Sequence, residues 1–82
     1  MNTNEERMES ALATQIKVEL AERDLTQTDL AELVGVGRPA MNRYMRGKAS
    51  MPMPTFFKVA EALSLSPAVL MDRVVARASK ED

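Results

Sequence analysis

Residues 25–48 carry two sets of helix boundary signals within a very short stretch of chain. Thr26 can cap a helix N-terminus, and Asp29 three residues later completes the T-x-x-D form of a capping box. Gly35 can adopt the left-handed conformation that ends many helices. Pro39 follows closely and suits the first turn of a new helix, where backbone amides have no intrahelical partner. This spacing predicts two short helices joined by a tight turn.

Apolar periodicity extends the helical pattern along most of the chain. Leu12, Ile16 and Leu20 recur every four residues and form one apolar stripe. We expect helices over residues 8–23, 27–34, 38–46, 53–63 and 67–78. The 82-residue chain is thus expected to form one compact all-α domain of five helices over residues 8–78. A flexible N-terminus (residues 1–7) and a polar tail (residues 79–82) are expected to flank it.

The chain contains no cysteine and no histidine, which removes several classes of site. Disulfides, Cys/His zinc sites and histidine-based catalysis are excluded, and the sequence has no Gly-rich phosphate loop or carboxylate cluster. We therefore expect no enzyme, no metal, no cofactor and no small-molecule substrate. No apolar run approaches the ~20 residues that span a bilayer, and the polar, acidic N-terminus is not typical of a signal peptide. These features predict a cytoplasmic, nucleoid-associated protein without a membrane partner.

Charge is distributed unevenly along the chain, although the net charge is only −1. Residues 1–32 contain eight acidic and three basic side chains, whereas residues 33–60 contain five basic side chains and no acidic one. Binding to a polyanion depends on local charge rather than on the total. Three of these five basic residues lie in the second of the two short helices: Arg38, Arg43 and Arg46. This distribution favours a nucleic-acid surface there, the alternative being an ordinary solvated face.

The two short helices have the features of a helix-turn-helix. Ala31 is small where the helices would cross, Gly35 makes the turn, Val36 plugs it, and Met41 packs the second helix inward. The chain resembles the phage-repressor and Cro-like (XRE-type) helix-turn-helix family. The likeness covers about residues 11–72 and rests on LTQTDLA at 25–31, GV at 35–36, RYMRGK at 43–48 and AEAL at 60–63.

This resemblance implies a lambda-repressor-like domain in which residues 38–46 enter the major groove of double-stranded DNA and the preceding helix lies across the backbone. With Met41 and Tyr44 turned inward, helical spacing places polar side chains on the outer face, where arginine can pair with guanine and asparagine with adenine. The expected base-reading residues are Arg38, Pro39, Asn42 and Arg43. The expected phosphate-binding residues are Gln27, Arg46, Lys48 and Ser50. Surface ion pairing of the arginines and a purely solvated Asn42 are the alternatives.

Two positions depart from the family pattern. Gly37 stands where members usually have a serine or threonine cap, so the second helix loses a hydroxyl that could contact phosphate. Met45 stands where many members have a glutamate, and Leu20 aligns with that glutamate's arginine partner. We expect an apolar contact between Leu20 and Met45 in place of the ion pair.

The resemblance predicts a phage or prokaryotic transcriptional repressor that reads a palindromic operator as a homodimer. Two-fold pairing would place two recognition helices about one DNA turn apart, ~34 Å. Helix 67–78 offers the expected dimer surface, unless its apolar residues instead close the core of one chain: Val69, Leu70, Val74 and Val75. The alternative function is an antitoxin-like protein or adaptor whose main partner is another protein.

Overall fold

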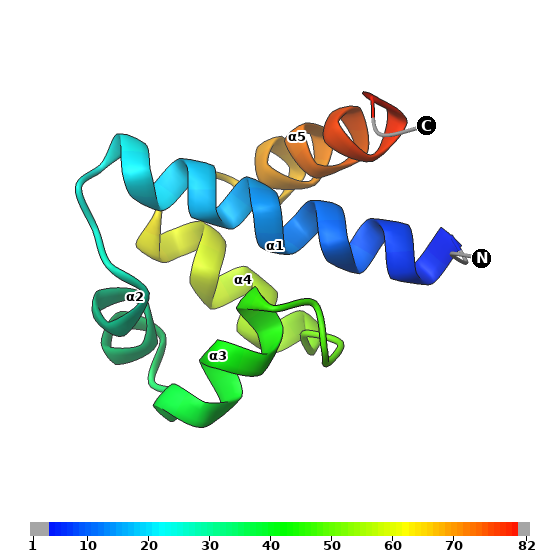
Figure 1. Cartoon of the computed structure of the whole chain (residues 1–82). Helices are drawn as coiled ribbons and strands as arrows, with labels where there is room; N and C mark the ends of the chain where they lie inside the picture. The colour runs from blue at the N-terminus through cyan, green and yellow to red at the C-terminus, as the bar shows by residue number, and fades with distance from the viewer. Residues whose placement is uncertain (1–3, 81–82) are drawn as a thin grey trace.

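The computed structural model describes residues 4–80, which form five helices and no strand. The helices are α1 (Asn4–Glu22), α2 (Gln27–Val34), α3 (Arg38–Met45), α4 (Met53–Ala62) and α5 (Pro67–Lys80). Long α1 packs along α5, while α2 and α3 lie together at one end of the molecule and α4 passes between these two groups (Figure 1). The sequence-based prediction of a compact all-α domain is confirmed. None of the five helices combines the length and apolar character needed to cross a lipid bilayer.

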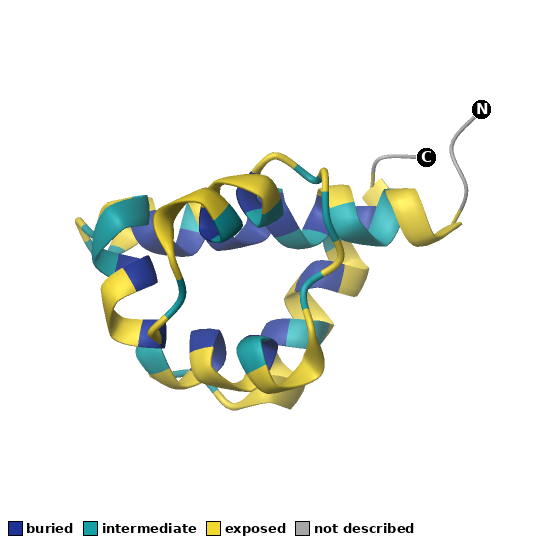
Figure 2. Cartoon of the chain, turned by 90° about the horizontal axis from the view of Figure 1, so that it is seen from below, coloured by how far each residue is buried: buried dark blue, intermediate teal, exposed yellow. Residues whose placement is uncertain are grey.

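One continuous apolar core holds the helices together. The buried stripe of each helix faces the inside of the molecule, and the exposed residues face outward (Figure 2). Ile16 of α1, Leu30 of α2, Leu63 after α4 and Leu70 of α5 are fully buried. Burying one such side chain contributes roughly 1.5–3 kcal/mol of transfer free energy. Every helix supplies buried residues, so the placement of each short helix depends on the others.

Local signals explain where α2 begins and ends. The Thr26 hydroxyl accepts a hydrogen bond from the Asp29 amide at 3.0 Å, and the Asp29 carboxylate accepts one from the Thr26 amide at 2.9 Å. These bonds complete the predicted capping box, and the bond from the Thr26 backbone holds the pKa of Asp29 below its ordinary value. At the other end, Gly35 adopts φ 81° and its amide bonds to Ala31.

Two other connections use the left-handed conformation without glycine. Asp24, after α1, has φ 55°, and Ser64, after α4, has φ 59°. The residue that follows each of them, Leu25 or Leu65, packs its side chain against the core. The Leu25 amide donates to the Leu20 carbonyl and the Leu65 amide to the Ala60 carbonyl, which closes each helix end. The left-handed conformation costs a non-glycine residue on the order of 1 kcal/mol. The sequence signals did not predict these two strained positions.

The ends of the outer helices differ from the expected ones. Helix α1 begins at Asn4 rather than Met8, and α5 continues to Lys80 rather than ending at Ala78. Residues 4–7 have no apolar stripe of their own, which is why the pattern placed them outside the helix. The Arg7 guanidinium donates to the Ala78 carbonyl at 3.4 Å and links the start of α1 to the end of α5. Of the expected flanking segments, residues 1–3 and 81–82 lie outside the described residues.

Half of the predicted dimer surface on α5 is wrong, because two of its four residues are buried. Leu70 is fully buried and Val74 is 1% exposed, so both residues close the core of a single chain. Their spacing of four residues places them on the face of α5 that packs against α1 and α4. Val69 and Val75 are exposed, at 41% and 47%. Only these two of the four residues remain available to a partner.

A buried carboxylate joins α1 to α5. Glu19 is 1% exposed, although a charged side chain is rarely buried without a partner. Its carboxylate accepts hydrogen bonds from Gln15 at 2.7 Å, Arg23 at 2.7 Å and Arg73 at 2.8 Å. Burial acts to raise the pKa of Glu19, but the bonds from Arg73, Gln15 and Arg23 outweigh it and hold the pKa below its ordinary value. In turn, Arg77 Nε donates to the side-chain oxygen Oε1 of Gln15 at 2.8 Å.

Candidate nucleic-acid interface

Helix α3 has one face in the core and one in solvent. Met41 and Met45 are each 1% exposed, which fixes the helix against the rest of the domain. Helical spacing then turns the polar residues away from the core, as the sequence predicted. The exposed set comprises Arg38, Pro39, Asn42 and Arg43, followed by Arg46 at the end of the helix. None of the three arginines forms an ion pair within residues 4–80.

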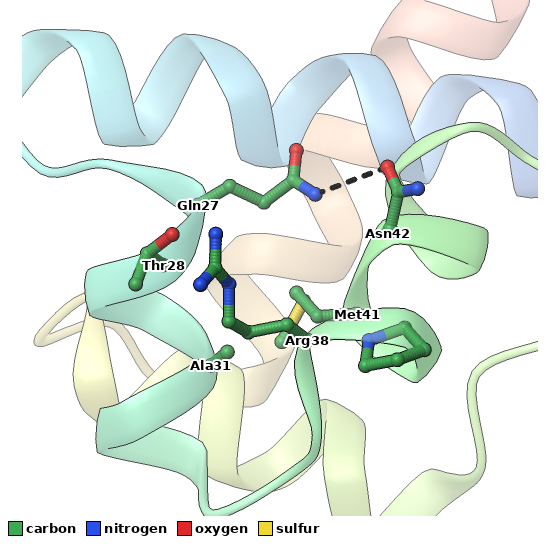
Figure 3. Close-up of a pocket in the computed structure, with 7 residues that line it drawn as sticks. Gln27, Thr28, Ala31, Arg38, Met41 and Asn42 are labelled. Atoms are coloured by element: carbon green, nitrogen blue, oxygen red, sulfur yellow. Dashed lines mark hydrogen bonds between the residues drawn. The ribbon is translucent and has the colours of Figure 1, made fainter.

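The start of α2 lies against this face. A cleft of about 440 Å³ opens between the two helices and is lined by Gln27 and Thr28 of α2 and by Arg38 and Asn42 of α3. Gln27 Nε2 donates to Asn42 Oδ1 at 3.4 Å, and the Arg38 side chain extends across the cleft towards α2 (Figure 3). The structure therefore brings a predicted phosphate-binding residue, Gln27, into contact with a predicted base-reading residue.

Tight packing in the turn keeps the two helices close. Ala31 is 2% exposed at the floor of the cleft, where a larger side chain would separate α2 from α3. Val36 is half-buried against the core and its amide bonds to the Ala31 carbonyl at 3.1 Å. Gly37 precedes α3 and makes no side-chain cap, as expected from its missing hydroxyl. The geometry is that of a helix-turn-helix whose second helix has one face fully open to solvent.

Sequence reasoning missed Thr28 as a cleft residue. It lies at the second position of α2, directly after Gln27, and its half-buried side chain lines the cleft. Its hydroxyl beside a helix N-terminus was the available signal, because such positions are suited to anions. Backbone amides at the start of α2 lack intrahelical acceptors and strengthen that suitability.

The remaining phosphate candidates differ in their surroundings. Arg46 and Lys48 are exposed on either side of Gly47, which has φ 68°. Ser50 instead donates its hydroxyl to the Glu9 carboxylate of α1. The negative charge of Glu9 beside this hydroxyl would repel a phosphate group. This placement therefore disfavours the prediction that Ser50 binds phosphate.

Leu20 and Met45, which stand where many family members have an ion pair, both lie in apolar surroundings. Both side chains are buried in the same core cluster, at 5% and 1% exposure. Tyr44 is half-buried and packs against this core rather than projecting with the exposed arginines. These three residues stabilise α3 from the inside.

Comparisons with known proteins agree with this geometry. A family model described as helix-turn-helix matches residues 16–70, which include α2, α3, α4 and their connections. The chain belongs to the Cro/C1-type helix-turn-helix family. It is therefore a DNA-binding transcription regulator of that type, and the resemblance inferred from sequence is confirmed.

A solved structure supports the fold over nearly the whole length of this family member. The clp gene regulator ClgR from Corynebacterium glutamicum superposes with a TM-score of 0.84 at 20% sequence identity. The match covers 90% of this chain and 79% of the ClgR chain. No curated protein sequence matches the chain significantly.

Proposed function

We propose that this protein is a transcriptional repressor that binds a specific double-stranded DNA sequence through α3. The observation that carries the proposal is the outer face of α3, where Arg38, Asn42 and Arg43 are exposed. The surrounding segment, residues 33–60, contains no acidic residue. An α-helix of this kind fits the major groove of B-DNA, which is about 12 Å wide. The helix brings hydrogen-bonding side chains to the base edges while Met41 and Met45 hold it on the domain.

Each exposed side chain on α3 is assigned the base chemistry that suits it. Arginine donates two hydrogen bonds to O6 and N7 of guanine, and asparagine pairs in the same way with N6 and N7 of adenine. Arg38 and Arg43 are therefore assigned to guanine and Asn42 to adenine. Pro39 offers only an apolar surface, which suits a thymine methyl group.

A second set of residues is assigned to the sugar–phosphate backbone. Gln27 and the free amides of α2 would bind one phosphate, and the hydrogen bond from Gln27 would orient Asn42 towards the groove. Arg46 and Lys48 would bind phosphates beyond the other end of α3. Ser50 is left out of the interface because Glu9 occupies its hydroxyl.

The repressor is further proposed to act as a homodimer on a palindromic operator. One helix of eight residues reaches only a few base pairs, and two-fold pairing doubles the sequence that is read. Val69 and Val75 are the exposed apolar residues of α5, but six positions of an α-helix place them on different sides. Val69→Lys and Val75→Lys are therefore to be compared by sedimentation equilibrium. One of the two is expected to give a monomer, and a wild-type monomer at every concentration would contradict the dimer.

In vitro selection from a random duplex library, followed by mobility-shift titration, tests DNA reading directly. We expect one enriched motif and a loss of binding to its scrambled version. Arg38→Ala and Arg43→Ala should each weaken binding by about 1–3 kcal/mol, because each removes one bidentate base contact. Lys80→Ala, at the exposed end of α5, removes one positive charge outside the basic segment 33–60 and serves as the matched control.

The same variants separate this proposal from a protein adaptor. If Arg38→Ala and Arg43→Ala bind the selected duplex as wild type does, α3 is not the reading element. Binding that is equal for selected and scrambled duplexes would contradict sequence specificity. Circular dichroism melting of each variant would show that the fold is retained, as expected for exposed positions.

A further inference from the structure

A second polar cleft, the Lys17 cleft, borders the end of α3. The cleft between α2 and α3 described above, the Gln27 cleft, borders the start of that helix. The Lys17 cleft has a volume of about 280 Å³ and lies between the middle of α1 and the end of α3. Lys17, Thr14 and Ser10 of α1 line one wall, and Arg46 and Gly47 line the other. The close approach of the two backbones forms the cleft, since a Cβ added to Gly47 would lie 3.9 Å from the Ser10 Cα (Figure 1).

The two cations of this cleft have no ion-pair partner among the described residues 4–80. Lys17 and Arg46 are both exposed, and neither forms an ion pair or a side-chain hydrogen bond within residues 4–80. By contrast, Arg23 and Arg73 are both engaged by Glu19. Two unpaired cations beside the Ser10 and Thr14 side chains offer an anion both charge and hydroxyl donors.

The position of this cleft relative to α3 indicates which anion it suits. Arg46 lies four residues after Asn42, and the two residues therefore share one face of the helix. The Gln27 cleft borders this face near its start, and the Lys17 cleft borders it near its end. A helix in the major groove lies between the phosphates of two strands, because the groove is about 12 Å wide and a helix with side chains is 10–12 Å across.

We propose that the Lys17 cleft binds a phosphate of the DNA strand opposite to the one bound at the start of α2. Lys17 and Arg46 supply the charge, and Ser10 and Thr14 supply hydroxyl groups. Helix α1 thereby becomes part of the DNA-binding surface, although its sequence is mainly acidic around this lysine. The inference rests on the proposed function, because it requires α3 to occupy the groove.

The test is the salt dependence of DNA binding by the 82-residue chain and its variants. Each phosphate contact contributes about 0.9 to the slope of log K against log salt. Lys17→Gln should lower that slope by about one for each bound protomer and weaken binding to selected and scrambled duplexes by the same factor. Lys80→Gln, which removes an equal charge from the exposed end of α5, should leave the slope unchanged.

The acidic residue of the cleft gives a test of opposite sign. Glu6 also lines the cleft, so Glu6→Gln should strengthen DNA binding by removing a repulsive charge. If Lys17→Gln keeps the wild-type slope, or if Lys80→Gln lowers it equally, the cleft is not a phosphate site even though the protein binds DNA. A wild-type chain that binds no duplex would overturn the proposed function and this inference together.

Discussion

Replacing Glu19 with glutamine tests how the α1–α5 interface is held together. The substitution keeps the size of the side chain but removes the charge that three donors share. Hydrogen bonds to a charged group contribute about 1.5–3 kcal/mol each, compared with about 0.5–1.5 kcal/mol for neutral pairs. The side chains of Arg23 and Arg73 are 29% and 44% exposed, so solvation by water offsets part of the loss. We therefore expect Glu19→Gln to lower the free energy of unfolding by about 1–2 kcal/mol at pH 7.

The pH dependence of this loss separates the charge from simple packing. Because folding lowers the pKa of Glu19 below its ordinary value of 4.5, the unfolded chain binds the proton more readily. The contribution of Glu19 is present above about pH 4.5 and is lost as the pH falls through the lower folded pKa. Urea unfolding of both proteins at a series of pH values should therefore show their stabilities converging in acid.

The matched control is Glu32→Gln at an exposed position of α2, because the Glu32 side chain makes no hydrogen bond or ion pair within residues 4–80. It should stay within about 0.5 kcal/mol of wild type at neutral pH. If Glu19→Gln is as stable as this control, or if the difference from wild type stays constant into acid, the ion pairs do not stabilise the interface. The reasoning from buried geometry would then be refuted.

Three further substitutions test local features of the fold. Thr26→Ala should cost about 1 kcal/mol by removing the cap of α2, and calorimetry that shows no lowered melting temperature would contradict this. Ser64→Gly should instead raise stability by about 0.5–1 kcal/mol, because glycine adopts φ 59° without a Cβ penalty; destabilisation in urea would be the opposing result. Met45→Ala should cost about 2–5 kcal/mol in urea unfolding, since it leaves a cavity beneath α3. The exposed Met53→Ala is its control and should have little effect, so an equal loss would argue against the core assignment.

Helix boundaries marked by local chemistry could be predicted from the sequence. Thr26, Asp29 and Gly35 interact with backbone within a few residues, so their pattern alone located α2 and the turn. The outer face of α3 followed from the helical period once Met41 was placed inside. The same period explains why the candidate base-reading residues of α3 were found without coordinates.

Features that depend on distant parts of the chain were missed or misplaced. Glu19 is buried because Arg73, 54 residues away, reaches its carboxylate. Val74 belongs to the core because α1 covers it, and a one-dimensional pattern does not distinguish that cover from a second subunit. The Lys17 cleft exists only because α1 crosses the end of α3. Each of these outcomes is decided by helix packing rather than by local propensity.

The division of α3 into two faces has a consequence for how such a regulator can acquire new target sites. Its inward residues, Met41 and Met45, are fixed by the core, whereas Arg38 and Arg43 are exposed and make no side-chain hydrogen bond or ion pair within residues 4–80. Changes at Arg38 or Arg43 should therefore cost the fold little, and, if these residues read bases as proposed, a single substitution could alter the preferred DNA sequence. Asn42 is more constrained, because a new residue there would also release Gln27. Under the proposed function, DNA recognition would diverge at the two arginines first while the scaffold stays the same.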